Sequence, residues 1–121
     1  SDKSNNQSIA SLHQLHLCVQ KGSLEDLQLL LRNGFDPNMA TSQGVVPMMI
    51  ASFRGNDLVV KELVLNKGKL EQEDNRGFTP LFYAIKGNQL EMVESLIELG
   101  ADIYHKDKLL TVNSSSALQN A

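Results

Sequence analysis

The run His13-x-x-His16-x-Cys18 contains the residue types that bind zinc, which prefers imidazole nitrogen and thiolate sulfur. On a helix, His13 and His16 share one face, but Cys18 lies roughly 200° around the axis from His16. No second cluster supplies the further ligands that a closed zinc site needs. The pattern favours a structural role for these side chains, and we predict no metal ion or other cofactor. An intrinsic metal-binding or catalytic activity at this run is the alternative, which metal analysis would test.

Catalytic patterns are weak elsewhere in the chain. Ser114–Ser116 and a distant histidine are not tied to one another by any spacing, so they do not define a triad. Glu91, Glu94 and Glu98 recur at helical spacing, which is typical of a solvated helix face. The sequence contains no glycine-rich phosphate-binding loop. We therefore predict that this chain is not an enzyme.

The stretch Asp74–Asp107 predicts two short helices separated by a polar break at Lys86–Gln89. Thr79 can cap free backbone N–H groups, and Pro80 has the φ that suits the first helical position. Gly100 permits the left-handed conformation that ends a helix. Two such helices cannot bury their apolar faces alone, so they need copies of themselves as neighbours.

Copies occur at a spacing of 33 residues, and three units align without a gap. Gly44 and Gly77 are one step apart, as are Pro47 and Pro80. The apolar positions follow the same step, as in the sets Leu27, Val60 and Val93; Leu30, Leu63 and Leu96; and Leu31, Val64 and Ile97. This period predicts a stack of helix pairs.

The repeat resembles the ankyrin repeat, whose pattern is a glycine, Thr-Pro-Leu, an alanine, a second apolar helix and Gly-Ala-Asp. The third unit has this pattern at Gly77, Thr79, Pro80, Leu81, Ala84, Leu96, Gly100, Ala101 and Asp102. Phe82 stands where the family usually has histidine. The resemblance covers roughly Leu12 to Asp107, and it implies an all-α solenoid of stacked helix-turn-helix units with β-hairpin loops.

We expect a flexible N-terminal segment at 1–10 and an ankyrin-repeat domain at 11–121. Its repeats should span about 11–40, 41–73 and 74–106, with a partial fourth at 107–121. Ser11 and Gln14 have the spacing of a capping box, so the first helix should begin near Ser11. Apolar side chains stand where a capping unit should be polar, at Leu109, Leu110 and Val112. We expect them to be covered by a missing second helix, by another domain of a longer parent protein or by a second copy of this chain.

Composition narrows the class of protein further. A net charge of −3 argues against a general nucleic-acid binder. No apolar run approaches the ~20 residues of a membrane-spanning helix, so we predict no membrane insertion. The single cysteine, Cys18, cannot form an internal disulfide, which fits a cytoplasmic or nuclear location.

The resemblance implies a non-catalytic protein-interaction module that binds a partner protein or peptide through a concave groove and the hairpin tips. The matching candidate positions are Lys21, Gln43, Val45, Phe53, Arg54, Arg76, Phe78 and Lys86. This set is basic and aromatic and contains no acid, whereas the predicted outer helices are acidic. We therefore expect a partner segment that carries acidic and apolar side chains.

Two alternatives stay open. Phe53 could pack on Phe78 or its neighbours, with the basic residues only solvating the edge. The domain could also regulate or dock a larger enzyme whose catalytic domain lies outside this chain.

Overall fold

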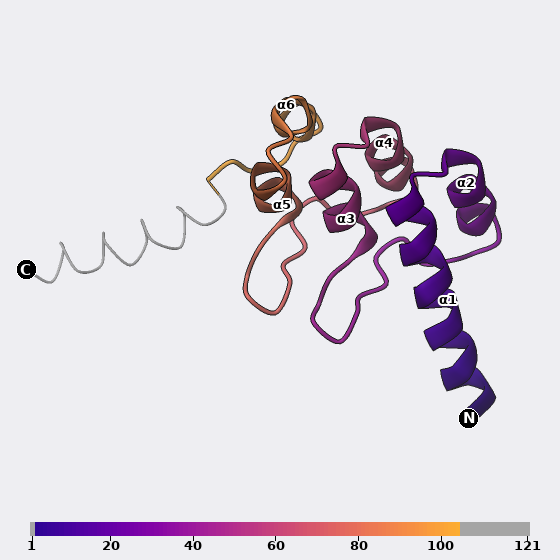
Figure 1. Cartoon of the computed structure of the whole chain (residues 1–121). Coiled ribbons are helices and arrows are strands. Elements are labelled where there is room, and N and C mark those ends of the chain that lie inside the picture. Colours follow the sequence, from indigo (N-terminus) through magenta and orange to yellow (C-terminus); the bar gives the residue numbers. More distant parts are fainter. Residues whose placement is uncertain (1, 105–121) are drawn as a thin grey trace, which may run out of the picture.

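The computed structural model describes residues 2–104 of the 121-residue chain, and side chains from residue 9 onward. This part contains only α-helices and loops (Figure 1). The helices are α1 (Asp2–Lys21), α2 (Leu24–Arg32), α3 (Pro47–Arg54), α4 (Asp57–Leu65), α5 (Pro80–Lys86) and α6 (Leu90–Glu98).

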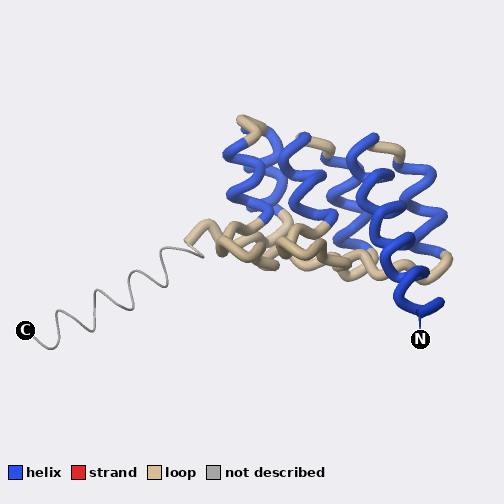
Figure 2. Tube along the Cα trace, turned by 60° about the horizontal axis from the view of Figure 1, so that its bottom comes forward, coloured by secondary structure: helices blue, strands red, loops and turns tan. Residues whose placement is uncertain are grey.

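The helices form two rows, with α1, α3 and α5 in an inner row and α2, α4 and α6 in an outer row (Figure 1). Helix α3 packs against both α1 and α5, and α2 packs against α4. Figure 2 shows the long loops gathered along one side of the helices. The predicted all-α stack of helix pairs is therefore confirmed.

Buried residues recur at the predicted period and join neighbouring units into one core. Val60 and Leu63 of α4 are fully buried, as is Leu27 of α2. Cys18, Ala51 and Ala84 occupy equivalent buried positions, where small side chains let the inner helices pack closely. The continuity of this core explains why the units need one another for stability.

The helix starts follow the residues at their caps. Oγ1 of Thr79 accepts a hydrogen bond from N of Phe82 at 3.4 Å, and Pro80 is the first residue of α5. Val46 precedes α3 and supplies no side-chain cap, because its apolar side chain has no oxygen that could accept a hydrogen bond. Both starts agree with the sequence.

The predicted start of the first helix near Ser11 is wrong. Helix α1 is continuous from Asp2, which places Ser11 and Gln14 inside it rather than at its cap. Residues 2–11 contain neither proline nor glycine, so nothing in the backbone ends the helix there. The side chain of Ile9 is 65% exposed, so core packing contributes little at that turn. The flexibility expected for residues 1–10 stays a prediction.

The long loops turn back on themselves without forming strands in the described part of the chain. N of Thr41 donates to O of Val45 at 2.9 Å, and N of Asp74 donates to O of Phe78 at 3.0 Å. A second bond in each loop joins N of Gly44 to O of Thr41 and N of Gly77 to O of Asp74. The expected β-hairpins are thus present as hairpin-shaped turns, closed by these backbone bonds rather than by a ladder of paired strands. The predicted partial repeat at 107–121, with the pair Leu109–Leu110, lies outside the described residues.

Within residues 2–104, the structure has no helix that combines the length and the apolar character needed to span a membrane.

Candidate functional site

Seven of the eight candidate residues line three adjoining hollows beside the inner helices. The loop hollow, about 330 Å³, is lined by Gln43, Val45, Asp74, Asn75 and Arg76. The aromatic hollow, about 130 Å³, is lined by Phe53, Arg76, Phe78, Phe82, Tyr83 and Lys86. The helix hollow, about 290 Å³, is lined by Gln20, Ile50, Phe53, Arg54 and Tyr83. Because adjoining hollows share lining residues, we describe them together as the inner groove.

Lys21 is the candidate that the structure places elsewhere. It lines a separate hollow of about 300 Å³ between α1 and α2, with Leu17, Cys18 and Asp26 among its neighbours. The sequence grouped Lys21 with the groove because it aligns with Arg54 of α3. The fold separates the two, since α1 is the first inner helix of the stack.

The two long loops are shaped by equivalent side chains one repeat apart. Oγ1 of Thr41 accepts hydrogen bonds from N of Gln43 at 3.2 Å and N of Val45 at 3.1 Å. Oδ1 of Asp74 makes the same two bonds in the next loop, to N of Arg76 and N of Phe78, both at 2.9 Å. Short polar side chains commonly close turns this way. These turns carry four candidate residues into the groove.

Asp74 also anchors the groove wall through its second oxygen. Oδ2 of Asp74 accepts from the hydroxyl of Tyr83 at 2.6 Å and from Nη2 of Arg76 at 3.2 Å. Asp74 is only 6% exposed, and burial alone would raise its pKa. The hydrogen bonds from Tyr83, from the two backbone N–H groups and from Arg76 outweigh burial and hold the pKa at about 2. Asp74 is therefore a buried, ionised support for the loop.

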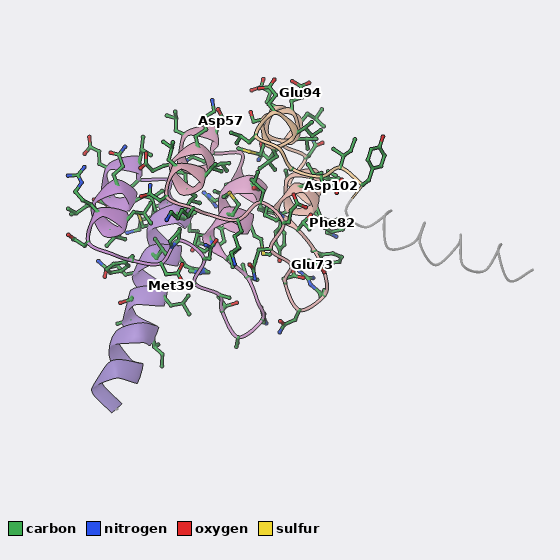
Figure 3. All side chains as sticks on the ribbon, turned by 180° about the vertical axis from the view of Figure 1, so that it is seen from behind. Met39, Asp57, Glu73, Phe82, Glu94 and Asp102 are labelled. Atoms are coloured by element: carbon green, nitrogen blue, oxygen red, sulfur yellow. The ribbon has the colours of Figure 1, made fainter. Side chains whose placement is uncertain are left out.

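A stack of aromatic rings and cations lies next to this support. The rings of Phe78 and Phe82 are nearly parallel, with centroids 4.1 Å apart and 14° between their planes. The guanidinium of Arg76 lies 4.6 Å from the Phe78 centroid, and Nζ of Lys86 lies 5.9 Å from the Phe82 centroid. Both distances fit cation–π contacts. In Figure 3, Phe82 lies on α5 beside the loop that carries Glu73.

Phe53 also lines the aromatic hollow and remains 48% exposed. Its backbone carbonyl accepts a hydrogen bond from Nε2 of Gln89 at 3.2 Å. A Cβ atom on Gly87 would lie 2.2 Å from the same carbonyl oxygen, so only glycine permits this approach of α3 to the end of α5. Phe53 lines the same hollow as Phe78, but the ring that stacks on Phe78 is that of Phe82.

The candidate set contains no acid, but the loop hollow is also lined by Asp74, which was not in that set. Its carboxylate forms an ion pair with Arg76, whose charge is therefore balanced within the domain. Among the described side chains, Arg54 and Lys86 form no ion pair. Figure 3 shows Asp57 and Glu94 on the outer helices, and Asp57 pairs there with Lys61 at 2.9 Å. The groove thus keeps a local excess of positive charge.

The sequence did not single out Asp74, Phe82 or Tyr83 as groove residues. One signal was available for Asp74, which aligns with Thr41 at the start of the equivalent loop. Phe82 and Tyr83 align with Met49 and Ile50, so the repeat itself did not mark them as aromatic positions.

Two members of the His13, His16 and Cys18 run, namely His16 and Cys18, make structural contacts. Nε2 of His16 donates to O of Met39 at 2.9 Å, and Sγ of Cys18 donates to O of Ser23 at 3.4 Å. Burial lowers the pKa of His16, against the opposing effect of its Met39 bond, and burial raises the pKa of the Cys18 thiol. The part of the chain that the structure describes contains no group of three His, Cys, Asp or Glu side chains placed to hold a metal ion.

Several known proteins resemble this chain. The alpha-latrocrustotoxin-Lt1a of Latrodectus tredecimguttatus is 37% identical over 81 residues, which cover 66% of this chain and 6% of the toxin. The tyrosine-protein kinase HTK16 of Hydra vulgaris is 29% identical, over 83% of this chain and 14% of the kinase. The ARF GTPase-activating protein GIT2 of Mus musculus is 34% identical, over 71% of this chain and 12% of that protein. The chain thus spans a small part of each relative's length.

A family model of three ankyrin repeats matches residues 15–107. That range includes five of the six described helices in full, both long loops and every residue of the inner groove. The chain therefore belongs to the ankyrin-repeat family.

Proposed function

We propose that this chain is a non-catalytic protein-interaction domain that serves as an adaptor, scaffold or targeting element. Ankyrin repeats are generally protein-interaction modules and are typically non-catalytic. The observation that carries the proposal is the inner groove, in which partly exposed aromatic side chains and exposed basic side chains line adjoining hollows. Aromatic and arginine side chains are enriched at protein interfaces.

The charge of the groove indicates the kind of partner. Arg54 and Lys86 lack acidic partners among the described side chains, whereas Asp57 and Glu94 lie on the outer helices. A segment with acidic and apolar side chains complements the groove, and nucleic acid does not fit a chain of net charge −3. We also propose a cytoplasmic or nuclear location, because the single cysteine is a buried free thiol.

Affinity capture with purified variants tests this function. The full chain is compared with Phe53→Ala/Arg54→Glu, which changes the groove. The control is Leu58→Ala/Lys69→Glu, which also truncates one apolar side chain and reverses one positive charge, but at exposed positions outside the groove. Circular dichroism checks that all three proteins fold. A partner that binds the wild type and the control but not the groove variant supports the proposal, once binding is reproduced with the purified partner. A partner that binds all three proteins equally would contradict the groove as the binding site.

A second candidate function is docking or regulation of a larger enzyme. The relatives favour it, because a tyrosine-protein kinase and a GTPase-activating protein each contain a matching region that is a small part of their length. The reading frame on either side of this chain tests it. Docking would be supported if the parent protein has a flanking catalytic domain that binds the purified wild-type chain but not the groove variant. A flanking sequence without a catalytic domain would contradict it.

A further inference from the structure

We infer that the aromatic hollow takes one uncharged apolar side chain of the partner segment, and that Lys86 and Arg54 bind carboxylates on either side of it. This inference rests on the proposed function and specifies the chemistry of the same groove. Phe53 lines both the aromatic hollow, which Lys86 also lines, and the helix hollow, which Arg54 also lines, so the two hollows meet at this ring.

The size of the aromatic hollow limits what can enter it. About 130 Å³ of space, lined by three phenylalanine rings and Tyr83, accommodates one aliphatic side chain rather than an apolar run. Phe53 is 48% exposed, so its ring offers apolar area that a partner can cover. Covering such area favours binding by about 25 cal/mol per Å².

The cations beside the rings determine which side-chain charge the hollow favours. Arg76 lies 4.6 Å from the Phe78 centroid and Lys86 lies 5.9 Å from the Phe82 centroid. Each of the two stacked rings thus already contacts a cation. A lysine or arginine that entered the hollow would be repelled by Lys86, which has no ion pair among the described residues. A neutral side chain flanked by acids avoids that repulsion and complements the cations.

The two cations of the aromatic hollow have different roles. Arg76 is committed to Oδ2 of Asp74 and to the hydroxyl of Tyr83, each at 3.2 Å, so it positions the wall and its charge is balanced. Lys86 has no such ion pair among the described residues, so it is available to a partner's carboxylate. Reversing Lys86 should therefore change the charge preference of the groove more than neutralising Arg76 does.

A random linear peptide library displayed on phage, selected on the immobilised full chain, tests the inference. We expect the enriched peptides to share one aliphatic residue with Asp or Glu on either side. Phe53→Ala and Lys86→Glu should each weaken a synthetic peptide of that motif by about tenfold or more, which corresponds to about 1.4 kcal/mol. Selection on Lys86→Glu should exchange an acidic position of the motif for a basic one.

Leu58→Ala and Lys69→Glu are the matched controls, since both residues are exposed outside the groove. They should leave peptide affinity within about twofold, well inside the factor of ten that 1.4 kcal/mol represents. Enriched peptides that are basic, or that bind Phe53→Ala and Lys86→Glu as tightly as the wild type, would overturn this inference while leaving a protein-binding function in place. A selection that enriches no sequence would count against both the inference and peptide binding by the groove.

Discussion

The hydroxyl of Tyr83 donates a 2.6 Å hydrogen bond to Oδ2 of Asp74, which joins helix α5 to the loop that precedes it. The same carboxylate closes the loop through the backbone N–H groups of Arg76 and Phe78. One buried acid thus determines both where the loop turns and how the aromatic stack faces the inner groove.

Asp74→Asn should destabilise the domain by about 2 kcal/mol at neutral pH. The native pKa of about 2 lies below the ordinary value of 3.8, so the ionised carboxylate adds stability above pH 3.8 and loses it as the pH falls toward 2. Urea unfolding between pH 6 and pH 2 measures this, and the variant should show a weaker loss of stability in acid. Glu94→Gln on an exposed face of α6 is the control. An unchanged acid dependence in Asp74→Asn would contradict the role of this carboxylate.

His16 should make stability fall in mild acid. Burial lowers its folded-state pKa below the ordinary 6.5, so its neutral form adds stability above pH 6.5 that is lost as the pH falls toward the folded-state value. His16→Gln should flatten the change in urea midpoint between pH 7.5 and pH 5.5, while Gln14→Ala, at an exposed position of the same helix, should not. Equal slopes in wild type and His16→Gln would rule out this histidine as the cause.

The period of 33 residues predicted the features that recur, namely the helix pairs, the buried columns and the positions of the long loops. It did not predict contacts between side chains that occur in one repeat only. Tyr83 aligns with Ile50, so the bond from Tyr83 to Asp74 has no counterpart in the preceding unit. The stack of Phe78 on Phe82 likewise depends on how one loop lies against one helix. The period therefore predicted the stack, and the family resemblance pointed to the loops and inner helices as the binding surface, but neither predicted how the side chains pair there.

Lys67→Gly should stabilise the domain by about 0.5–1 kcal/mol. Lys67 has φ of +72°, whereas the equivalent positions are Gly34 at +92° and Gly100 at +109°. A lysine side chain is strained in this left-handed conformation, and glycine removes the strain at a smaller entropic cost. Asn88→Gly, at φ of +55°, should gain less because asparagine tolerates the conformation better. The midpoints of urea unfolding compare the stability of the variants. A lower midpoint for Lys67→Gly would show that the lysine side chain stabilises the domain by more than its left-handed backbone destabilises it.

Gly87→Ala should destabilise the domain by about 1–3 kcal/mol and weaken peptide binding by the groove. The backbone φ of −80° at this position would itself suit alanine. The added methyl group would lie 2.2 Å from O of Phe53, so the ends of α3 and α5 must separate. That shift would also break the bond from Nε2 of Gln89 to the same carbonyl.

Gly34→Ala is the contrasting variant, because no atom lies within 4 Å of its added carbon and only its φ of +92° opposes the change. Both glycine variants should lower the midpoint of urea unfolding. Only Gly87→Ala should also reduce the affinity for peptides selected on the groove, when that affinity is measured under conditions where both variants remain folded. Unchanged peptide affinity in Gly87→Ala would show that the spacing of α3 and α5 does not control the aromatic hollow.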